Sequence, residues 1–143
     1  MIIALIILFS CSSDDNSSSS SSYKITVTLN DVNTTDDFIS IVVVGNNQSG
    51  VNNYPMWKLN GVNQENVQTI SLGKNDFTGT TKTYVMETVN PIEILTSGVQ
   101  IINYGNPLTG SFKIEKNGTI LINQDINLVD DNSDFTQDYS YSN

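Results

Sequence analysis

Apolar and polar residues alternate along most of this chain, and this period of two is the feature that most restricts its fold. In residues 23–30, Ile25, Val27 and Leu29 alternate with lysine and threonine, as in a strand with one buried face. Similar segments follow, rich in β-branched residues and separated by turn residues about every 8–12 positions. No segment shows a convincing helical period. The pattern therefore predicts an all-β domain.

Two Asn-Gly pairs mark turns between the expected strands. Asn-Gly accepts the positive φ angles that a two-residue type I′ hairpin requires. Asn117-Gly118 is the strongest such signal, and Asn60-Gly61 is expected to lie between two candidate partner strands, 54–59 and 67–72. The expected strands cover residues 23–30, 38–44, 54–59, 67–72, 82–89, 91–96, 99–104, 111–116 and 119–124, with 125–129 as an extension of the last.

Eight or nine short strands are too many for one sheet, because a single sheet could not cover its own apolar face. Two stacked sheets cover each other. We therefore predict an antiparallel two-sheet β-sandwich, immunoglobulin-like, over residues 23–129, with a barrel as the alternative. The residues expected to meet between the sheets are Ile25, Val27, Ile41, Val43, Trp57, Ile70, Tyr84, Ile94, Ile101, Phe112, Ile114 and Ile122.

The charged residues exclude several function classes. The chain has six basic and fifteen acidic residues and no histidine, for a formal net charge of −9, and all six basic residues are lysines. Without arginine it lacks the planar group that binds phosphate through two hydrogen bonds. Without histidine it lacks the commonest general base. A negative surface repels nucleic acid, so we expect no nucleic-acid partner.

Nothing in the sequence marks a catalytic site. No serine lies in a Gly-x-Ser-x-Gly context, and no histidine is present to activate a nucleophile. Glu87 and Glu93 flank an apolar segment and Glu65 lies in an expected loop, so a carboxylate pair for glycoside hydrolysis is the distant alternative. We expect solvated carboxylates and a protein that is not an enzyme.

The N-terminus carries the clearest motif. Residues 1–10 form an apolar run that ends in the small residue Ser10, directly before Cys11, the single cysteine. The run is too short to span a bilayer, which needs about 20 residues, and it fits the apolar region of a secretory signal. The sequence Leu8-Phe9-Ser10-Cys11 resembles the lipobox of bacterial lipoproteins. The resemblance implies cleavage before Cys11 and a diacylglycerol on its sulfur, with no other cofactor.

Residues 11–22 follow as a polar tether that ends in a run of serines and has almost nothing to bury. Its beginning, Ser12, Ser13, Asp14 and Asp15, resembles the acidic export signal of lipoproteins from the Bacteroidetes group. The resemblance implies a lipid-anchored protein of the outer membrane that faces the outside of the cell.

The acidic C-terminus, residues 130–143, is expected to be a polar tail after the last strand. The alternative is a weak calcium site at Asp130, Asn132 and Asp134, because carboxylate and amide oxygens are the ligands that Ca²⁺ prefers. This spacing resembles the start of an EF-hand loop, but Phe135 replaces the required glycine.

Aromatic residues offer a possible ligand-binding surface. Tyr54, Trp57 and Tyr104 could form a stacking platform for sugars, whereas a lone tryptophan in a β-sandwich is more often core. The exposure of Trp57 decides between the two. We expect a cell-surface binding or accessory module with a glycan or outer-membrane protein as partner, or alternatively an assembly subunit of an outer-membrane complex.

Overall fold

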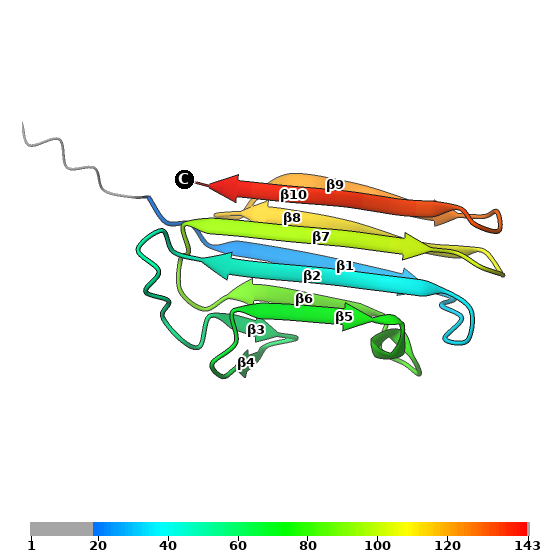
Figure 1. The fold of residues 1–143 in the computed structure, drawn as a ribbon, viewed down its shortest axis with the longest axis horizontal. Helices are drawn as coiled ribbons and strands as arrows, with labels where there is room; N and C mark the ends of the chain where they lie inside the picture. Colours follow the sequence, from blue (N-terminus) through cyan, green and yellow to red (C-terminus); the bar gives the residue numbers. More distant parts are fainter. Residues whose placement is uncertain (1–18, 143) are drawn as a thin grey trace, which may run out of the picture.

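The computed structural model describes residues 19–142, which form two antiparallel sheets packed face to face (Figure 1). The larger sheet has the strand order β4-β3-β6-β1-β8-β9, and the smaller has the order β10-β7-β2-β5. The predicted two-sheet β-sandwich is confirmed. Within residues 19–142, no helix is long and apolar enough to cross a membrane. The elements are β1 (Tyr23–Asn30), β2 (Phe38–Asn46), β3 (Trp57–Leu59), β4 (Val62–Gln64), β5 (Thr69–Gly73), the 3-10 helix η1 (Lys74–Phe77), β6 (Thr83–Thr88), β7 (Ile94–Ile102), β8 (Leu108–Lys116), β9 (Thr119–Leu128) and β10 (Asp134–Ser142).

Alternation along each strand builds the core between the sheets. In β1, Ile25, Val27 and Leu29 are fully buried, and the residues between them point outward. Trp57 and Phe112 add two of the largest buried side chains. Burying one such side chain contributes about 1.5–3 kcal/mol, so this single core accounts for most of the favourable free energy of folding. Of the twelve core residues predicted, Ile25, Val27, Ile41, Val43, Trp57, Ile70, Ile101, Phe112 and Ile114 are buried, and Tyr84 and Ile122 are partly buried against the core.

Ile94 was wrongly expected in the core. The Ser97-Gly98 pair reads as a turn between two strands, but β7 runs through it without interruption. Leu95 and Ser97 therefore point inward, and Ile94 lies on the outer face of the sheet.

The expected acidic tail is also wrong, because its greater part is a strand. β10 pairs with β7 along its whole length, from Asp134↔Ile102 to Ser142↔Ile94. Tyr139 stacks on Phe112 with ring centroids 5.4 Å apart, so β10 closes one side of the core. Aromatic and polar residues alternate in this segment as they do in a strand, but its acidic residues are also typical of a solvated tail.

Both Asn-Gly pairs form tight turns, although one joins different strands from those expected. Asn117 and Asn60 have φ angles of 50° and 48°, as a type I′ turn requires. The first turn joins β8 to β9, as predicted. The second joins β3 to the short β4, whereas β5 pairs with β2 in the other sheet. The expected pairing of 54–59 with 67–72 is therefore wrong.

The last residues of the expected tether belong to the fold. Ser21 is 4 % exposed and exchanges two backbone hydrogen bonds with Ile92, of 2.8 and 2.9 Å. Asn117 also forms two hydrogen bonds with Ser22: its backbone N–H donates to the Ser22 carbonyl, and its side-chain Oδ1 accepts from the Ser22 N–H. The chain therefore enters the sandwich at a defined end, beside the β8–β9 turn.

Candidate functional site

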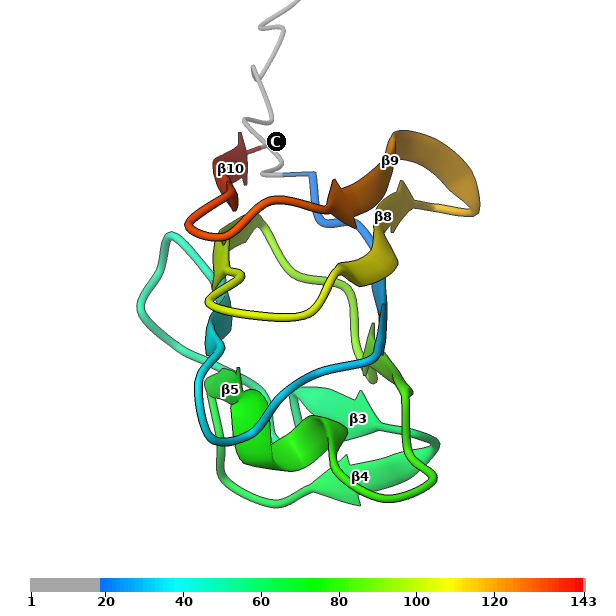
Figure 2. The same ribbon diagram turned by 90° about the vertical axis from the view of Figure 1, so that its right-hand side faces the viewer.

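The end of the sandwich opposite the entry of the N-terminal segment is built from connecting loops. We call it the distal end, and Figure 2 looks onto it. Each of its connections joins a strand of one sheet to a strand of the other, so both sheets anchor the loops of this end. It comprises η1 and residues 31–37, 78–82, 103–107 and 129–133.

A buried carboxylate joins two of these loops. Asp37 is 1 % exposed, and its Oδ2 accepts a hydrogen bond from the backbone N–H of Asn33 at 2.7 Å. Its Oδ1 accepts from the backbone N–H of Tyr104 at 3.1 Å. A buried charge is tolerated when hydrogen bonds of this kind satisfy it. Asp37 therefore fixes residues 31–37 against the β7–β8 loop.

A buried side-chain amide joins the β9–β10 loop to the β7–β8 loop. Asn103 is fully buried, and its Nδ2 donates to the carbonyl oxygens of Leu128 and Asp130, each at 3.1 Å. Its backbone N–H and C=O bind Ser133 and Asn132. Asp37 and Asn103 thus hold the loops of the distal end in one arrangement. Sequence reasoning missed both, and the available signal was a polar residue directly next to a strand end.

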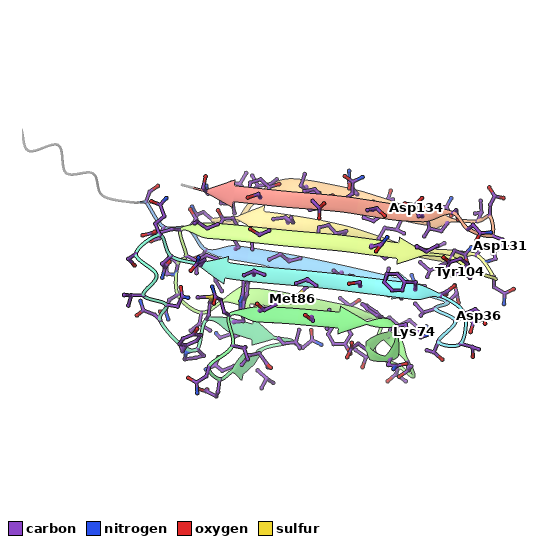
Figure 3. All side chains as sticks on the ribbon, in the orientation of Figure 1. Asp36, Lys74, Met86, Tyr104, Asp131 and Asp134 are labelled. Atoms are coloured by element: carbon purple, nitrogen blue, oxygen red, sulfur yellow. The ribbon has the colours of Figure 1, made fainter. Side chains whose placement is uncertain are left out.

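Carboxylates gather at the distal end. Two lysines accompany them, and the amine of Lys74 donates to the Thr35 carbonyl at 3.2 Å. The ion pairs Lys24–Glu87 and Lys113–Glu115 lie on the larger sheet, away from these acids. A cluster of negatively charged carboxylates raises the local concentration of cations. The aspartates are Asp31, Asp36, Asp37, Asp76, Asp130, Asp131 and Asp134, and Figure 3 labels Asp36, Asp131 and Asp134 at this end.

Of the predicted calcium residues, Asp130 and Asn132 lie in the short loop between β9 and β10, and Asp134 is the first residue of β10. Asp134 Oδ2 accepts from the Thr136 hydroxyl at 3.0 Å, and Asn132 has a φ angle of 63°. The backbone oxygen of Asp130 accepts the Ser133 N–H at 3.1 Å. Among residues 19–142, no three Asp, Glu, His or Cys side chains converge to hold a metal. The oxygen donors suit Ca²⁺, but they do not form a ready-made site.

The three predicted ligand-binding aromatics are not brought together. Trp57 is fully buried, and its Nε1 donates to the Gln68 carbonyl at 2.9 Å, so it is a core residue. Tyr54 and Tyr104 are both 43 % exposed. Tyr54 lies in the loop after β2 and Tyr104 in the loop after β7. Because β2 and β7 are antiparallel, these loops lie at opposite ends of the sandwich.

The glutamates considered for hydrolysis are also apart. Glu87 forms an ion pair with Lys24 at 3.4 Å on the outer face of the larger sheet. Glu93 Oε2 accepts from the Gln48 N–H at 2.6 Å, and Glu65 is exposed after β4. The predicted lipidation residue Cys11 and the predicted export signal, Ser12 to Asp15, lie outside the described residues.

Solved structures of three bacterial proteins share this sandwich. No family model and no curated protein matches the chain. A DUF4425 family protein from Bacteroides ovatus has 18 % identity and a TM-score of 0.57, covering 87 % of this chain and 96 % of its own. A protein of Parabacteroides distasonis, solved in a calcium-bound form, has 14 % identity and a TM-score of 0.62, covering 92 % and 99 %.

The third structure is a domain of unknown function, DUF4425, from Bacteroides vulgatus. It has 12 % identity and a TM-score of 0.61, covering 87 % of this chain and 95 % of its own. At these identities the likeness concerns the fold. This chain is therefore similar in architecture to DUF4425 proteins over nearly their whole length.

Proposed function

We propose that this protein is a lipid-anchored binding module on the outer face of the outer membrane and that it catalyses no reaction. One structural observation carries the proposal: the N-terminal segment enters at one end of the sandwich, and the loops held by Asp37 and Asn103 lie at the other. A strand of nine residues is about 30 Å long. A lipid on Cys11 would therefore place the distal end away from the bilayer.

The composition and the fold neighbours support this assignment. The chain has no histidine, and its single thiol, Cys11, is assigned to the lipid. All three similar structures come from Bacteroides or Parabacteroides, which belong to the bacterial group whose export signal Ser12 to Asp15 resemble. Loops on a rigid sandwich are common sites of binding.

Acyl labelling in the native host tests the anchor. The wild type should incorporate labelled fatty acid and stay in the outer-membrane fraction, whereas Cys11→Ala should do neither. An impermeant amine reagent should modify the lysines of the wild type on intact cells. Equal labelling of the two proteins, or modification only after lysis, would contradict the proposal. Co-purification with outer-membrane proteins in a fixed ratio would instead indicate an assembly subunit.

Calcium binding at the distal end is a second candidate function. It is favoured by the calcium-bound form of the Parabacteroides protein and by the aspartates at this end. Ca²⁺ takes six to eight oxygen ligands, including backbone carbonyl and Asn side-chain oxygens. Asn33 and Asn132 would supply amide oxygens beside Asp36 and Asp131.

Calorimetry and thermal unfolding test the calcium site. A ligand at about 100 times its Kd stabilises the folded state by about 2.7 kcal/mol, so saturating Ca²⁺ should raise the Tm. Asp36→Asn and Asp131→Asn should reduce this rise. Asp125→Asn, in the middle of β9, is the matched control and should leave it unchanged. No heat and no rise of the Tm at millimolar Ca²⁺ would exclude the site.

A further inference from the structure

Two of the four glycines within strands are explained by packing. A Cβ on Gly45 would lie 2.6 Å from the Met56 sulfur and 3.0 Å from the Trp57 ring. A Cβ on Gly110 would overlap the backbone oxygen of Thr28. These two glycines therefore leave room for the core and for the neighbouring strand.

The other two strand glycines have no such explanation. The one atom within 4 Å of a Cβ on Gly98 is a carboxylate oxygen of Asp138, at 3.1 Å, which is the far end of an exposed side chain. A Cβ on Gly73 would lie 3.7 Å from the Ile39 oxygen, an ordinary contact. Neither glycine has a positive φ angle. Gly73 ends β5 and is the N-cap of η1, whereas Gly98 lies inside β7. Glycine inside a strand costs stability and often marks a place where a ligand approaches.

Both of these glycines lie on the outer face of the smaller sheet. Gly98 is paired with Val42 of β2, and Gly73 with Ser40 two residues away on the same strand. Above Gly98 the surface is hollowed by about 270 Å³. Drug-sized sites measure about 300–1,000 Å³, so this hollow suits a smaller group such as one sugar ring. It is lined by Ser40, Val42, Gly98, Val99, Gln100, Thr136 and Asp138.

Several polar groups around the hollow are available to a ligand. The Ser40 hydroxyl, the Gln100 amide and the Asp138 carboxylate form no side-chain hydrogen bond with any residue of 19–142. Together they offer donors and acceptors on both sides of the glycine. The side chain of Val42 and the Cα of Gly98, which carries no side chain, form an apolar floor between them. An apolar floor with polar groups at its rim matches a sugar ring, which has C–H faces and hydroxyl edges.

The charges of this face disfavour an anionic ligand. Along β2, β5, β7 and β10, the outward-facing residues include Asp134 and Asp138 but no lysine. An aromatic side chain lies next to the hollow, because Phe38 precedes Ser40 by two residues on β2 and is 43 % exposed. Two residues along a strand span about 7 Å. A second sugar unit would therefore reach the Phe38 ring.

We propose that the outer face of the β10-β7-β2-β5 sheet binds a neutral oligosaccharide. One ring occupies the hollow above Gly98 and forms hydrogen bonds with Ser40, Gln100 and Asp138, and the next ring stacks on Phe38. This inference rests on the proposed binding function and names its ligand class, but it places the sugar on the outer sheet face rather than on the loops of the distal end. It moves that site from the predicted platform of Tyr54, Trp57 and Tyr104 to a surface that the sequence did not indicate.

Amide chemical shifts of the isotope-labelled protein, residues 19–143, test the site, because the described fold begins there. The probes are cellotriose, maltotriose, mannotriose and N,N′,N″-triacetylchitotriose at millimolar concentration, with trigalacturonate and trilysine as charged probes. At least one neutral trisaccharide should shift the amides of Gly98, Gln100 and Thr136. No shift with any neutral probe, or shifts at this face with trilysine alone, would overturn the proposal.

Variants separate this site from the rest of the molecule. Gly98→Val fills the hollow and should weaken binding of the active trisaccharide by about tenfold or more. Gln100→Ala removes a rim group without altering the strand backbone and should weaken the same binding. Thr26→Val, on the outer face of the larger sheet, is the matched control. If Gly98→Val binds the sugar normally, the sugar does not occupy this hollow. Acyl labelling and surface amine labelling test the anchor and the surface location separately, so their outcome does not depend on this result.

Discussion

The carboxylate of Asp37 accepts a hydrogen bond from the backbone N–H of Tyr104 at 3.1 Å, although 67 residues separate them in the chain. The contact crosses between two connecting loops. It explains how an end made of loops keeps a defined shape without a disulfide. Asp37→Ala should leave two N–H groups of the distal end without partners, a cost of about 1–3 kcal/mol for each buried group.

Chemical denaturation measures that effect. Asp37→Asn keeps the shape and one acceptor oxygen, so its loss of stability should be smaller than that of Asp37→Ala. Asp36→Ala is the control from the same loop, because its side chain is exposed and accepts one bond from Asn33. Equal stability of Asp37→Ala and wild type would show that the contact does not hold the loops.

The two kinds of strand glycine should respond differently to alanine. Gly110→Ala drives a methyl group into the Thr28 carbonyl and should destabilise the protein by about 1–3 kcal/mol. Gly73 has extended angles, φ −120° and ψ −178°, and space for a Cβ. Gly73 is also the N-cap of η1, where alanine is less favourable than glycine, so Gly73→Ala should change the stability little: the weaker cap offsets the reduced freedom of the unfolded chain. Urea midpoints of both variants check this contrast, and similar midpoints would refute it.

Trp57 should report on the core. Because it is fully buried, acrylamide should quench its fluorescence slowly in the native protein and rapidly after unfolding. The double variant Trp57→Phe/Tyr104→Trp moves the fluorophore to an exposed position and should be quenched rapidly in the folded state. Rapid quenching of the native wild type would place Trp57 at the surface.

Removing residues 134–142 should abolish cooperative unfolding. The deletion removes β10, which is hydrogen-bonded to β7 along its whole length. It also removes Tyr139, whose ring stacks on Phe112. Gln137→Ala, an exposed change within the same strand, should alter stability by less than about 0.5 kcal/mol. Circular dichroism melting distinguishes the two. A deleted protein that melts like the wild type would restore the expectation of a dispensable tail.

Two partly buried tyrosines should make the protein sensitive to alkali. Burial raises the pKa of Tyr139 and Tyr141 above the ordinary value of 10.0, and neighbouring tyrosines add to both shifts. The unfolded chain therefore loses these protons first. Their contribution to stability is fully present below about pH 10 and is lost as the pH rises above it. Tyr141→Phe should flatten this fall in urea titrations, and an identical slope in both proteins would contradict the assignment.

Local patterns were enough to predict the class of fold. Alternation places Ile25 and Val27 inside, and Asn117-Gly118 forms the expected turn, because both depend on a few neighbouring residues. The lipobox and export signal are likewise local. The sequence alone therefore determined that the chain is a two-sheet antiparallel β-sandwich. It also predicts that a lipid on Cys11 anchors this domain to the membrane.

Pairings between distant segments were decided only by the tertiary structure. Ser97-Gly98 reads locally as a turn, yet β7 continues through it because β2 and β10 bind it on both sides. The strand β10 and the Asp37–Tyr104 contact depend in the same way on partners far along the chain. The hollow above Gly98 exists because three strands bring Ser40, Gln100 and Asp138 to one face. Strand order and register determine such a surface, and no short stretch of sequence encodes them.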